Sequence, residues 1–461
     1  MSTGESNVGS NRRFWTLLGL IMLVGLSGRT AYASSHRSMP VNGDSYAYHG
    51  GANLLADGKG YIDPYRYRDP HKVWQTADHP PLYILYLAAW SSVGVDTPTG
   101  HRLASVLIGT ATIALVALAA RRWFTPNAGL VAAGIVAINP NFWFYDGSLH
   151  AETVAQCTAA ALLWAAAVMV DRPRLRSAVV LGVVAGLAAL SRSELLAMIP
   201  LVAVPCAAGW VRRRESLERE PIRSRLVATA KRTNLRLVVA AVVASLIVMA
   251  PWVAYNESRF EVSAPLGNGY GITLLSGNCD LTYSGQFMAY WAKPCVDASV
   301  ARVEATGVDQ SQLDQAMRQE GFDYISAHKG RFLVVSAARV ARVFGFFRPN
   351  QTRQLEHFPD GREVIVANLG SAAWYLFASL AVLGAVVARR RGAPLSPFVA
   401  PYLAVAAAVF TTVATTRYRS IVEVPTAMLA GYALVRLSSM WIERRATRLS
   451  SPASDTQIDQ G

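Results

Sequence analysis

Eleven long runs of apolar residues fix the kind of fold that this sequence can adopt. Ten of them contain no charged residue, and the eleventh is interrupted only by Glu423 and Arg436. Each run approaches the roughly 20 apolar residues that carry an α-helix across a bilayer, some at the short end of that range. The sequence therefore predicts an all-α polytopic membrane protein with about 11 membrane helices, and it excludes a soluble enzyme, a nucleic-acid module and a disordered scaffold. The runs are Phe14–Gly28, Pro81–Val95, Leu103–Ala120, Trp123–Tyr145, Thr153–Val170, Ser177–Ser191, Leu195–Val211, Leu237–Asn256, Val364–Ala388, Gly392–Thr416 and Ile421–Ile442.

The basic residues are concentrated beside these runs. The chain has 44 Lys and Arg against 30 Asp and Glu, which gives a formal charge of +14. Because basic loops of membrane proteins stay on the cytoplasmic side, the excess indicates topology rather than nucleic-acid binding. The clusters are Arg12–Arg13, Arg172–Arg176, Arg212–Arg236, Arg389–Arg391 and Arg444–Arg448.

The clusters divide the chain into four parts and place two loops outside. Segment 211–236 is densely basic and is expected to be cytoplasmic, which leaves the segment after it on the outer side. The parts are a membrane module at 1–255 with a first external loop at 34–80, a second external loop with an interfacial helix at 256–368, C-terminal membrane helices at 369–442, and a cytoplasmic tail at 443–461.

Two points of this topology stay open. An odd number of apolar runs lies between the two external loops, but two loops on the same side of a membrane must be joined by an even number of crossings. Either Pro81–Val95 therefore dips into the membrane and returns, or Arg121–Arg122 lies outside. The first run is followed by Ala31-Tyr32-Ala33, which also fits a signal-peptide cleavage site. We prefer a retained anchor, and both readings place the loop from Ser34 onward outside.

The four cysteines fall into two groups. Cys157 and Cys206 lie inside apolar runs and are expected to be small buried residues. Cys279 and Cys295 share the second external loop, in a compartment where disulfides persist. We therefore predict a disulfide between Cys279 and Cys295. No Cys or His spacing is typical of a zinc site, and we expect no metal.

Ionisable residues near the outer face are the candidates for catalysis. The sequence has no motif that binds the phosphates of a nucleotide, and no cofactor is expected. Asp44 follows the first apolar run in a polar loop, where it could act as a general base or simply cap a helix. His79 precedes two prolines that fit a helix start. Glu152 stands at the outer end of an apolar run, where a helix dipole also favours it. Arg192 could simply pair with Glu194. A functional role is nevertheless the default hypothesis for a charged residue within a membrane segment.

Basic residues in the second external loop run against the topology rule. Arg339, Arg342 and Arg348 lie in or after an amphipathic stretch near Arg331–Phe347, which is typical of a helix in the membrane interface. Arginine binds phosphate through paired N–H donors, so we expect these three residues to bind a lipid phosphate. Attraction to bulk anionic headgroups is the alternative.

Read in order, these segments resemble the GT-C superfamily of glycosyltransferases that use polyprenyl-phosphate sugars, in particular the branch with protein O-mannosyltransferases and aminoarabinose transferases. The likeness runs from about residue 14 to 440, and it rests on the order of the motifs rather than on any single one. The motifs are Asp44 with Tyr46, Gly58-x-Gly60-Tyr61, His79-Pro80-Pro81-Leu82, Arg102, Ser148-Leu149-His150-Ala151-Glu152, Leu190-Ser191-Arg192-Ser193-Glu194, Pro251-Trp252 with Asn256, Gly269-Tyr270-Gly271, Gly277-Asn278 and Arg417-Tyr418-Arg419.

The resemblance implies a GT-C-type helix bundle with two external loops, a catalytic Asp in the first loop and a donor bound from the outer leaflet. Asp44 matches the catalytic Asp, and the matched positions suggest that substrate contacts Tyr46, His79, Arg102, Glu152 and Arg192. Two positions depart from the family pattern. Tyr255 stands where many relatives have Arg, and His79 stands where some relatives carry Lys or Glu.

The expected function is therefore an integral cell-membrane glycosyltransferase that is active on the extracytoplasmic side. It would move a sugar from a polyprenyl-phosphate donor to a hydroxyl of a cell-envelope lipid, glycan or protein, and it would invert the anomeric centre. Nucleic acid is not an expected partner. A polyprenyl-lipid or sugar transporter is the alternative. Transporters place key charges near the membrane midplane and often show internal repeats, whereas these charges are expected at the outer face and no repeat is visible.

Overall fold

A computed structural model describes residues 3–68, 72–212, 233–304 and 307–450. This part of the chain is built from helices, and its one β-type pairing is an isolated bridge between Ile62 and Gln75. The predicted all-α fold class is therefore confirmed. Most of the basic segment 211–236, predicted to be cytoplasmic, lies outside the described residues.

Six helices of the described chain are long and apolar enough to cross a membrane, and a bent helix pair adds a seventh candidate. Four further apolar stretches are shorter, so the count of about 11 spans remains a prediction. The long helices are α1 (Thr3–Ser35), α5 (Pro98–Trp123), α8 (Glu152–Asp171), α12 (Leu235–Glu257), α19 (Val364–Arg390) and α21 (Ser420–Ser450), and the pair is α6 (Pro126–Ile138) with α7 (Pro140–Ser148). The shorter stretches are α4 (Pro81–Ser91), α9 (Leu175–Ser191), α20 (Ser396–Thr411) and the segment of η1 (Ser193–Ala197), η2 (Ile199–Ala203) and α10 (Val204–Ala207).

Prolines set where several of these helices begin. Helices α4, α5, α6 and α7 each start at a proline, whose missing N–H costs nothing in the first helical turn. The side chain of Asn139 caps α7 directly after α6 ends, and the two helices meet at an angle of 48°. At about 1.5 Å per residue, the 11 residues of α4 span roughly half of a bilayer core, which supports the alternative in which this run enters the membrane and returns.

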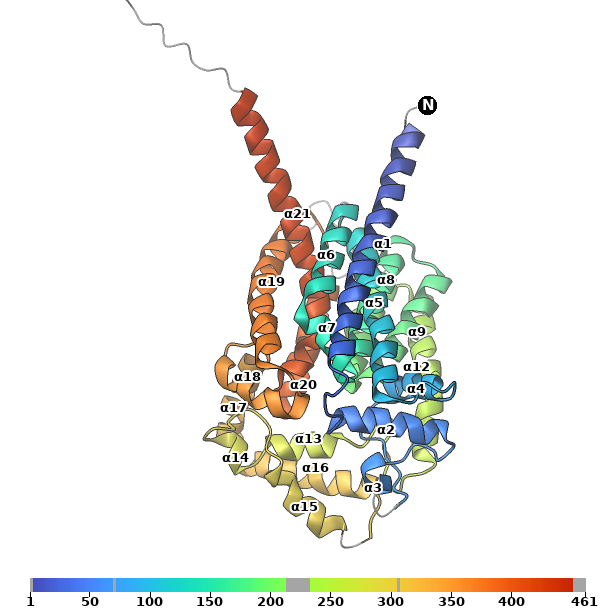
Figure 1. The fold of residues 1–461 in the computed structure, drawn as a ribbon, viewed down its shortest axis with the longest axis vertical. Helices are drawn as coiled ribbons and strands as arrows, with labels where there is room; N and C mark the ends of the chain where they lie inside the picture. The colour runs from blue at the N-terminus through green and yellow to red at the C-terminus, as the bar shows by residue number, and fades with distance from the viewer. Residues whose placement is uncertain (1–2, 69–71, 213–232, 305–306, 451–461) are drawn as a thin grey trace, which may run out of the picture.

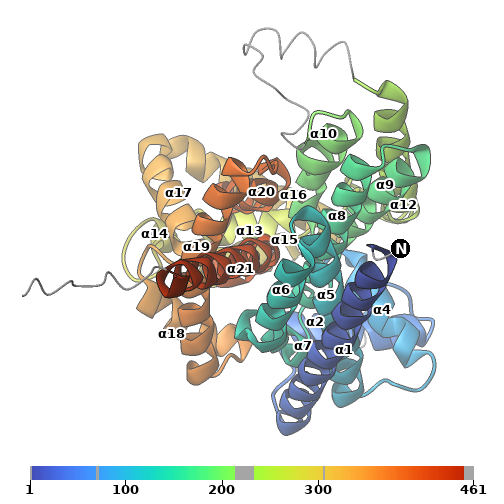
Figure 2. The same ribbon diagram turned by 90° about the horizontal axis from the view of Figure 1, so that it is seen from above.

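Small residues allow the membrane helices to approach closely. A Cβ atom at Gly182 of α9 would lie 2.1 Å from the carbonyl oxygen of Ala241 in α12, and a Cβ at Gly384 of α19 would lie 2.1 Å from that of Leu429 in α21. Lipid offers no hydrophobic drive for helix pairing, so such backbone contacts are a main source of helix association. Seen from above, α17–α21 gather on one side of the bundle, and α1, α4, α9 and α12 on the other (Figure 2).

The segments predicted to be external lie together at one end of the bundle, opposite the projecting ends of α1 and α21 (Figure 1). Helix α2 crosses beneath the spans there, almost at right angles to them. Cys279 and Cys295 form a disulfide in this region, with their Cα atoms 6.2 Å apart. The helices at this end are α2 (Asp44–Ala56), α3 (Pro64–Arg68), α13 (Tyr270–Gly277), α14 (Asp280–Tyr283), α15 (Pro294–Glu304), α16 (Gln310–Ala327), α17 (Lys329–Val343) and α18 (Pro349–Asp360).

Candidate active site

Asp44 is the first residue of α2 and lies between two cationic groups. Its Oδ2 atom accepts a hydrogen bond of 2.7 Å from Nη2 of Arg417, and its Oδ1 atom lies 3.5 Å from Nε2 of His79. Gly43 before it has a φ of +52°, a left-handed conformation that glycine adopts at little cost. The Asp44 side chain is 39% exposed, so a substrate can reach it while its partners hold its orientation.

The neighbours of Asp44 control its ionisation and that of His79. Burial opposes the charged carboxylate, but Arg417 and then His79 outweigh it and hold the pKa of Asp44 well below its usual value. Burial likewise opposes a charged imidazole, but the hydrogen bond and charge of Asp44 outweigh it and raise the pKa of His79. Asp44 is therefore an anion over the whole physiological range of pH.

Arg417 links Asp44 to a second carboxylate. It lies in η4 (Thr416–Arg419), directly before α21, and its Nε donates a 3.0 Å hydrogen bond to Oε1 of Glu152. Glu152 is the first residue of α8 and is fully buried. One guanidinium thus joins the start of α2, the start of α8 and the entry to the last helix.

Arg192 completes this cluster from the end of α9. It forms a short hydrogen bond with Oε1 of Glu152, donates from Nε to Oε1 of Glu194 at 2.5 Å, and stacks 4.8 Å above the ring of Tyr418. Oε2 of Glu152 is buried and has no hydrogen-bond partner among the described residues. The Glu152 carboxylate holds the Arg192 guanidinium next to that of Arg417, and Arg417 in turn contacts Asp44.

Aromatic side chains form the wall behind His79. Its ring meets Tyr48 edge-on at 4.7 Å, and Tyr48 in turn meets Tyr83 at 5.1 Å. The Tyr83 hydroxyl is hydrogen-bonded to Oγ of Ser105 at 2.7 Å. Because these rings come from α2 and α4, they fix His79 relative to Asp44.

The loop that carries Arg417 is fixed by α18. Glu356 accepts hydrogen bonds of 2.5 Å from both the backbone N–H and the hydroxyl of Thr416. On the other side of the loop, Arg419 lies over the Trp374 ring at 4.3 Å and donates to Glu423 at 3.2 Å. Arg417 therefore points to Asp44 from a loop that is held on both sides.

The cluster contains four of the residues expected from sequence: Asp44, His79, Glu152 and Arg192. Two others lie elsewhere. Arg102 is buried and donates to three carbonyl oxygens, those of Gly147, Arg37 and Met39, so it ties the loop after α1 to the end of α7. Tyr46 is the third residue of α2 and packs against Tyr65, with 4.7 Å between the two ring centroids.

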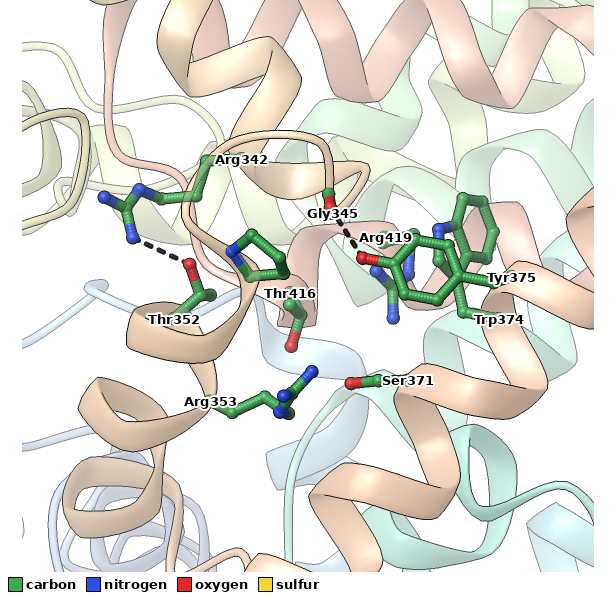
Figure 3. A pocket seen from close by; sticks show the side chains of 10 residues that line it. Arg342, Gly345, Thr352, Arg353, Ser371, Trp374, Tyr375, Thr416 and Arg419 are labelled. Atoms are coloured by element: carbon green, nitrogen blue, oxygen red, sulfur yellow. Dashed lines mark hydrogen bonds between the residues drawn. The ribbon is translucent and has the colours of Figure 1, made fainter.

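The three arginines expected to bind a lipid phosphate are held by other groups in this structure. Arg339 donates to the carbonyl oxygens of Gly277 and Phe410, and Arg348 to that of Gly285. Arg342 donates to Oγ1 of Thr352 at 2.7 Å and lines a small cavity beside Thr416 (Figure 3). That cavity holds about 20 Å³, which suffices for a water molecule but not for a phosphate group.

Two residues that organise the site were not assigned a role from the sequence. Arg417 was noted only as part of a motif, and Glu356 was not singled out. A signal for Arg417 exists, because basic residues are scarce at the outer end of a membrane helix, and Arg417 and Arg419 both stand at the start of the last one. The described residues contain no group of three or more His, Cys, Asp or Glu side chains that could hold a metal ion.

Comparison with known proteins identifies the fold. Residues 78–255, less than half of the chain, match the family described as dolichyl-phosphate-mannose-protein mannosyltransferase. The archaeal oligosaccharyltransferase AglB from Archaeoglobus fulgidus, in complex with an inhibitory peptide and a dolichol-phosphate, aligns over 97% of this chain and 53% of its own, with a TM-score of 0.53 and 16% identity. The same organism's enzyme tethered to an acceptor peptide aligns over 94% of this chain and 50% of its own, with a TM-score of 0.54 and 15% identity.

These comparisons confirm the resemblance to GT-C glycosyltransferases, and the structural alignments show that the chain has the same fold. The chain spans about half the length of the oligosaccharyltransferases that it matches. No curated protein sequence gives a significant match.

Proposed function

We propose, starting from the GT-C fold, that this chain is a membrane glycosyltransferase that moves a sugar from a polyprenyl-phosphate donor to an acceptor hydroxyl, with Asp44 as the general base. The observation that carries the proposal is the state of Asp44. It is held ionised by Arg417 and His79, yet more than a third of its side chain is exposed at the edge of a buried charge cluster. The matched family and AglB, which was solved with dolichol-phosphate, support a lipid-linked donor.

In the proposed reaction the acceptor oxygen attacks the anomeric carbon of the sugar from the side opposite the phosphate. The acceptor proton passes to the Asp44 carboxylate as the new C–O bond forms. The bond between the anomeric carbon and the phosphate oxygen breaks, and its electron pair leaves with the polyprenyl phosphate. A single displacement of this kind inverts the anomeric centre.

The leaving phosphate gains negative charge in this step, and the cluster supplies positive charge nearby. Arg417 contacts Asp44 directly, and Arg192 reaches the same Glu152 oxygen as Arg417. We assign the stabilisation of the leaving phosphate to these two arginines, since charge placed in advance at the site of a developing anion is an effective form of catalysis. His79 is proposed to orient the Asp44 carboxylate through their contact.

A transport assay and a transfer assay distinguish this function from the alternative of a lipid or sugar transporter. Membranes from cells that overproduce the chain would be given a panel of radiolabelled polyprenyl-phosphate sugars. We expect the wild-type chain to cleave the sugar–phosphate bond of at least one donor, and Asp44→Asn to leave that donor intact. Movement of intact donor across the membrane with no cleavage of any donor would support the transporter instead.

A further inference from the structure

Arg259 lies two residues beyond the end of α12 and is not used in the mechanism proposed above. Its guanidinium donates to two backbone carbonyl oxygens of the first external loop, from Nη1 to Tyr61 at 2.9 Å and from Nη2 to Thr76 at 2.6 Å. It also donates to Oε1 of Gln75 at 3.0 Å and to Oδ1 of Asn256 at 2.8 Å. These contacts, called here the Arg259 clamp, join the end of a long apolar helix to the first external loop.

The carbonyl oxygens bound by Arg259 lie where the first external loop folds back on itself. The isolated bridge there pairs Ile62 with Gln75, and the Thr76 N–H donates to the Tyr61 carbonyl oxygen at 3.3 Å. A pairing this short is barely stable by itself in water. The guanidinium therefore closes a turn of the chain that its own backbone bonds would hold only weakly.

Aromatic rings hold the guanidinium of Arg259 in one orientation. Its central carbon lies 4.4 Å from the ring centroid of Tyr255, 4.5 Å from that of Phe260, 5.5 Å from that of Trp252 and 5.6 Å from that of Tyr61. Aromatic rings attract a cation at these distances, and a planar guanidinium also presents its donors in a fixed fork. A lysine in its place would keep the charge but lose the fork that reaches both carbonyl oxygens.

Tyr61 connects the Arg259 clamp to the proposed active site. Its buried ring packs against Trp252 with 4.8 Å between centroids, and its hydroxyl donates to the carbonyl oxygen of His79 at 3.2 Å. Nε2 of His79 lies 3.5 Å from Oδ1 of Asp44. A continuous series of contacts therefore runs from Arg259 through Tyr61 and His79 to the proposed base.

The backbone between the bridge and the histidine is held from the second external loop as well. The Ala77 N–H donates to Oδ1 of Asn268 and to Oε1 of Gln310, each at 3.1 Å, and the Ala77 carbonyl oxygen accepts from the Asn268 N–H at 3.0 Å. A Cβ atom at Gly269 would lie 2.5 Å from the carbonyl oxygen of Asp78, so the two backbones are in direct contact there. The segment that ends at the histidine is therefore docked on the second loop along its length.

We propose that Arg259 is a positioning residue of the proposed active site, which holds His79 against Asp44 by clamping the first external loop to the end of α12. The inference rests on the proposed glycosyltransferase function and makes the site depend on docking of the second external loop. The charged groups that act most on His79 are Asp44 from α2, Asp78 beside it and Arg417 from η4. Arg259 acts on it through the position of the backbone.

Titration of His79 by NMR tests the Arg259 clamp without any turnover. The full-length protein would carry isotope-labelled histidine in detergent, and His79→Asn would assign the resonance. Burial lowers the pKa of His79, but Asp44 raises it by more, so the net pKa lies above the ordinary value of 6.5. We expect it to fall toward that value in Arg259→Gln and in Arg259→Lys. The lysine keeps the positive charge, so a fall in that variant reports position.

Two further variants separate positioning from folding. Arg331 also lies in the second external loop and donates from Nε and Nη2 to the backbone carbonyl oxygen of Tyr283, at 2.9 Å and 2.6 Å. Arg331→Gln is therefore the matched control, and it should leave the pKa of His79 unchanged even where it lowers the melting temperature. Tyr61→Phe removes only the hydroxyl bonded to His79 and keeps the ring, so it should fold like wild type and lower the pKa of His79 in part.

Sugar transfer gives the second measurement. We expect kcat to fall by about tenfold to a hundredfold in Arg259→Gln, as for a misplaced catalytic group, with KM for the donor little changed. A His79 pKa that is unchanged in the Arg259 and Tyr61 variants would overturn the positioning role, and so would an ordinary His79 pKa in wild type. Failure of wild type to transfer any sugar would overturn the proposed function, while a shifted titration would leave the Arg259 clamp standing.

Discussion

Nε of Arg417 lies 3.0 Å from Oε1 of Glu152, and this hydrogen bond joins residues that are 265 positions apart in the chain. The same guanidinium reaches Asp44 at 2.7 Å. The proposed catalytic base is therefore positioned by the last membrane helix as much as by its own loop.

The Asp44 carboxylate is expected to be the acid side chain that catalysis can least lose. Asp44→Asn keeps the size of the side chain but removes the base, and loss of a general base typically costs about 10²–10⁴-fold in rate. Sugar transfer would be measured with the donor found by the labelled panel. Asp57→Asn, on an exposed residue directly after α2, is the matched control and should stay near wild type. Near-normal transfer by Asp44→Asn would show that another group is the base.

Glu152 is expected to matter for both stability and activity. Glu152→Gln removes the anion shared by Arg192 and Arg417 in a fully buried position, and breaking a buried ion pair typically costs about 3–5 kcal/mol. We expect a lower melting temperature in detergent and transfer reduced by at least tenfold, since Arg417 is no longer held. Glu194→Gln, which affects Arg192 alone, should cost less on both measures. Equal losses in the two variants would contradict the central role of Glu152.

The acid limb of the pH profile should depend on Arg417. Burial raises the pKa of Asp44, but Arg417 and His79 lower it by more, so the net pKa lies below the usual carboxyl range. Wild-type activity should therefore persist to a pH below that range and fall only as the pH drops through the depressed pKa. In Arg417→Gln the pKa of Asp44 rises, and the acid limb of kcat/KM should move to higher pH. Arg391→Gln, in an exposed basic cluster, should leave the limb unchanged. An unshifted limb in Arg417→Gln would mean that Asp44 does not control it.

The disulfide between Cys279 and Cys295 should be measurable by thiol counting. The unfolded protein should bind two maleimides per chain without reductant and four with it, because Cys157 and Cys206 are free. The bond closes a loop with a sequence separation of 16, for which chain entropy predicts a stabilisation of about 3 kcal/mol. The Cys279→Ser, Cys295→Ser double variant should therefore melt at a lower temperature. Four maleimides without reductant would refute the bond.

The two ends of the bundle should differ in access from outside the cell. Ser326 is exposed on α16, at the end of the bundle that carries the proposed active site (Figure 1), and Arg174 is exposed in a basic loop before α9. With Cys157 and Cys206 replaced, an impermeant maleimide should label Ser326→Cys in intact cells and Arg174→Cys only after lysis. The reverse pattern would place the site in the cytoplasm, where the proposed donor orientation fails.

The sequence was sufficient for the fold class and for four members of the charge cluster, because each carries its own signal. Apolar runs predict membrane helices. The four ionisable residues lie at or beside the ends of such runs, and they are Asp44, His79, Glu152 and Arg192. Their convergence is a property of helix packing, which the order of motifs indicated only through the resemblance to GT-C enzymes.

The arginines show where sequence reasoning stops. Arg102, Arg339 and Arg348 donate to backbone carbonyl oxygens, and every residue carries such an acceptor, so no pattern of side chains reveals the pairing. Arg417 has a carboxylate partner at each end of its guanidinium, but both partners are more than 200 positions away. An external arginine that ties loops together and one that serves a site look alike until the chain is folded.

The contacts of Arg417 with Asp44 and Glu152, called here the Arg417 bridge, have a consequence for the nascent chain. A ribosome produces Asp44, Glu152 and Arg192 long before it reaches η4, so a partly made chain already carries the proposed base without the Arg417 guanidinium that contacts it. Activity should therefore begin only when translation has passed η4 and α21 has entered the membrane. The bridge makes synthesis through α21 a condition for use of the proposed lipid-linked donor, and products truncated before η4 should not consume it.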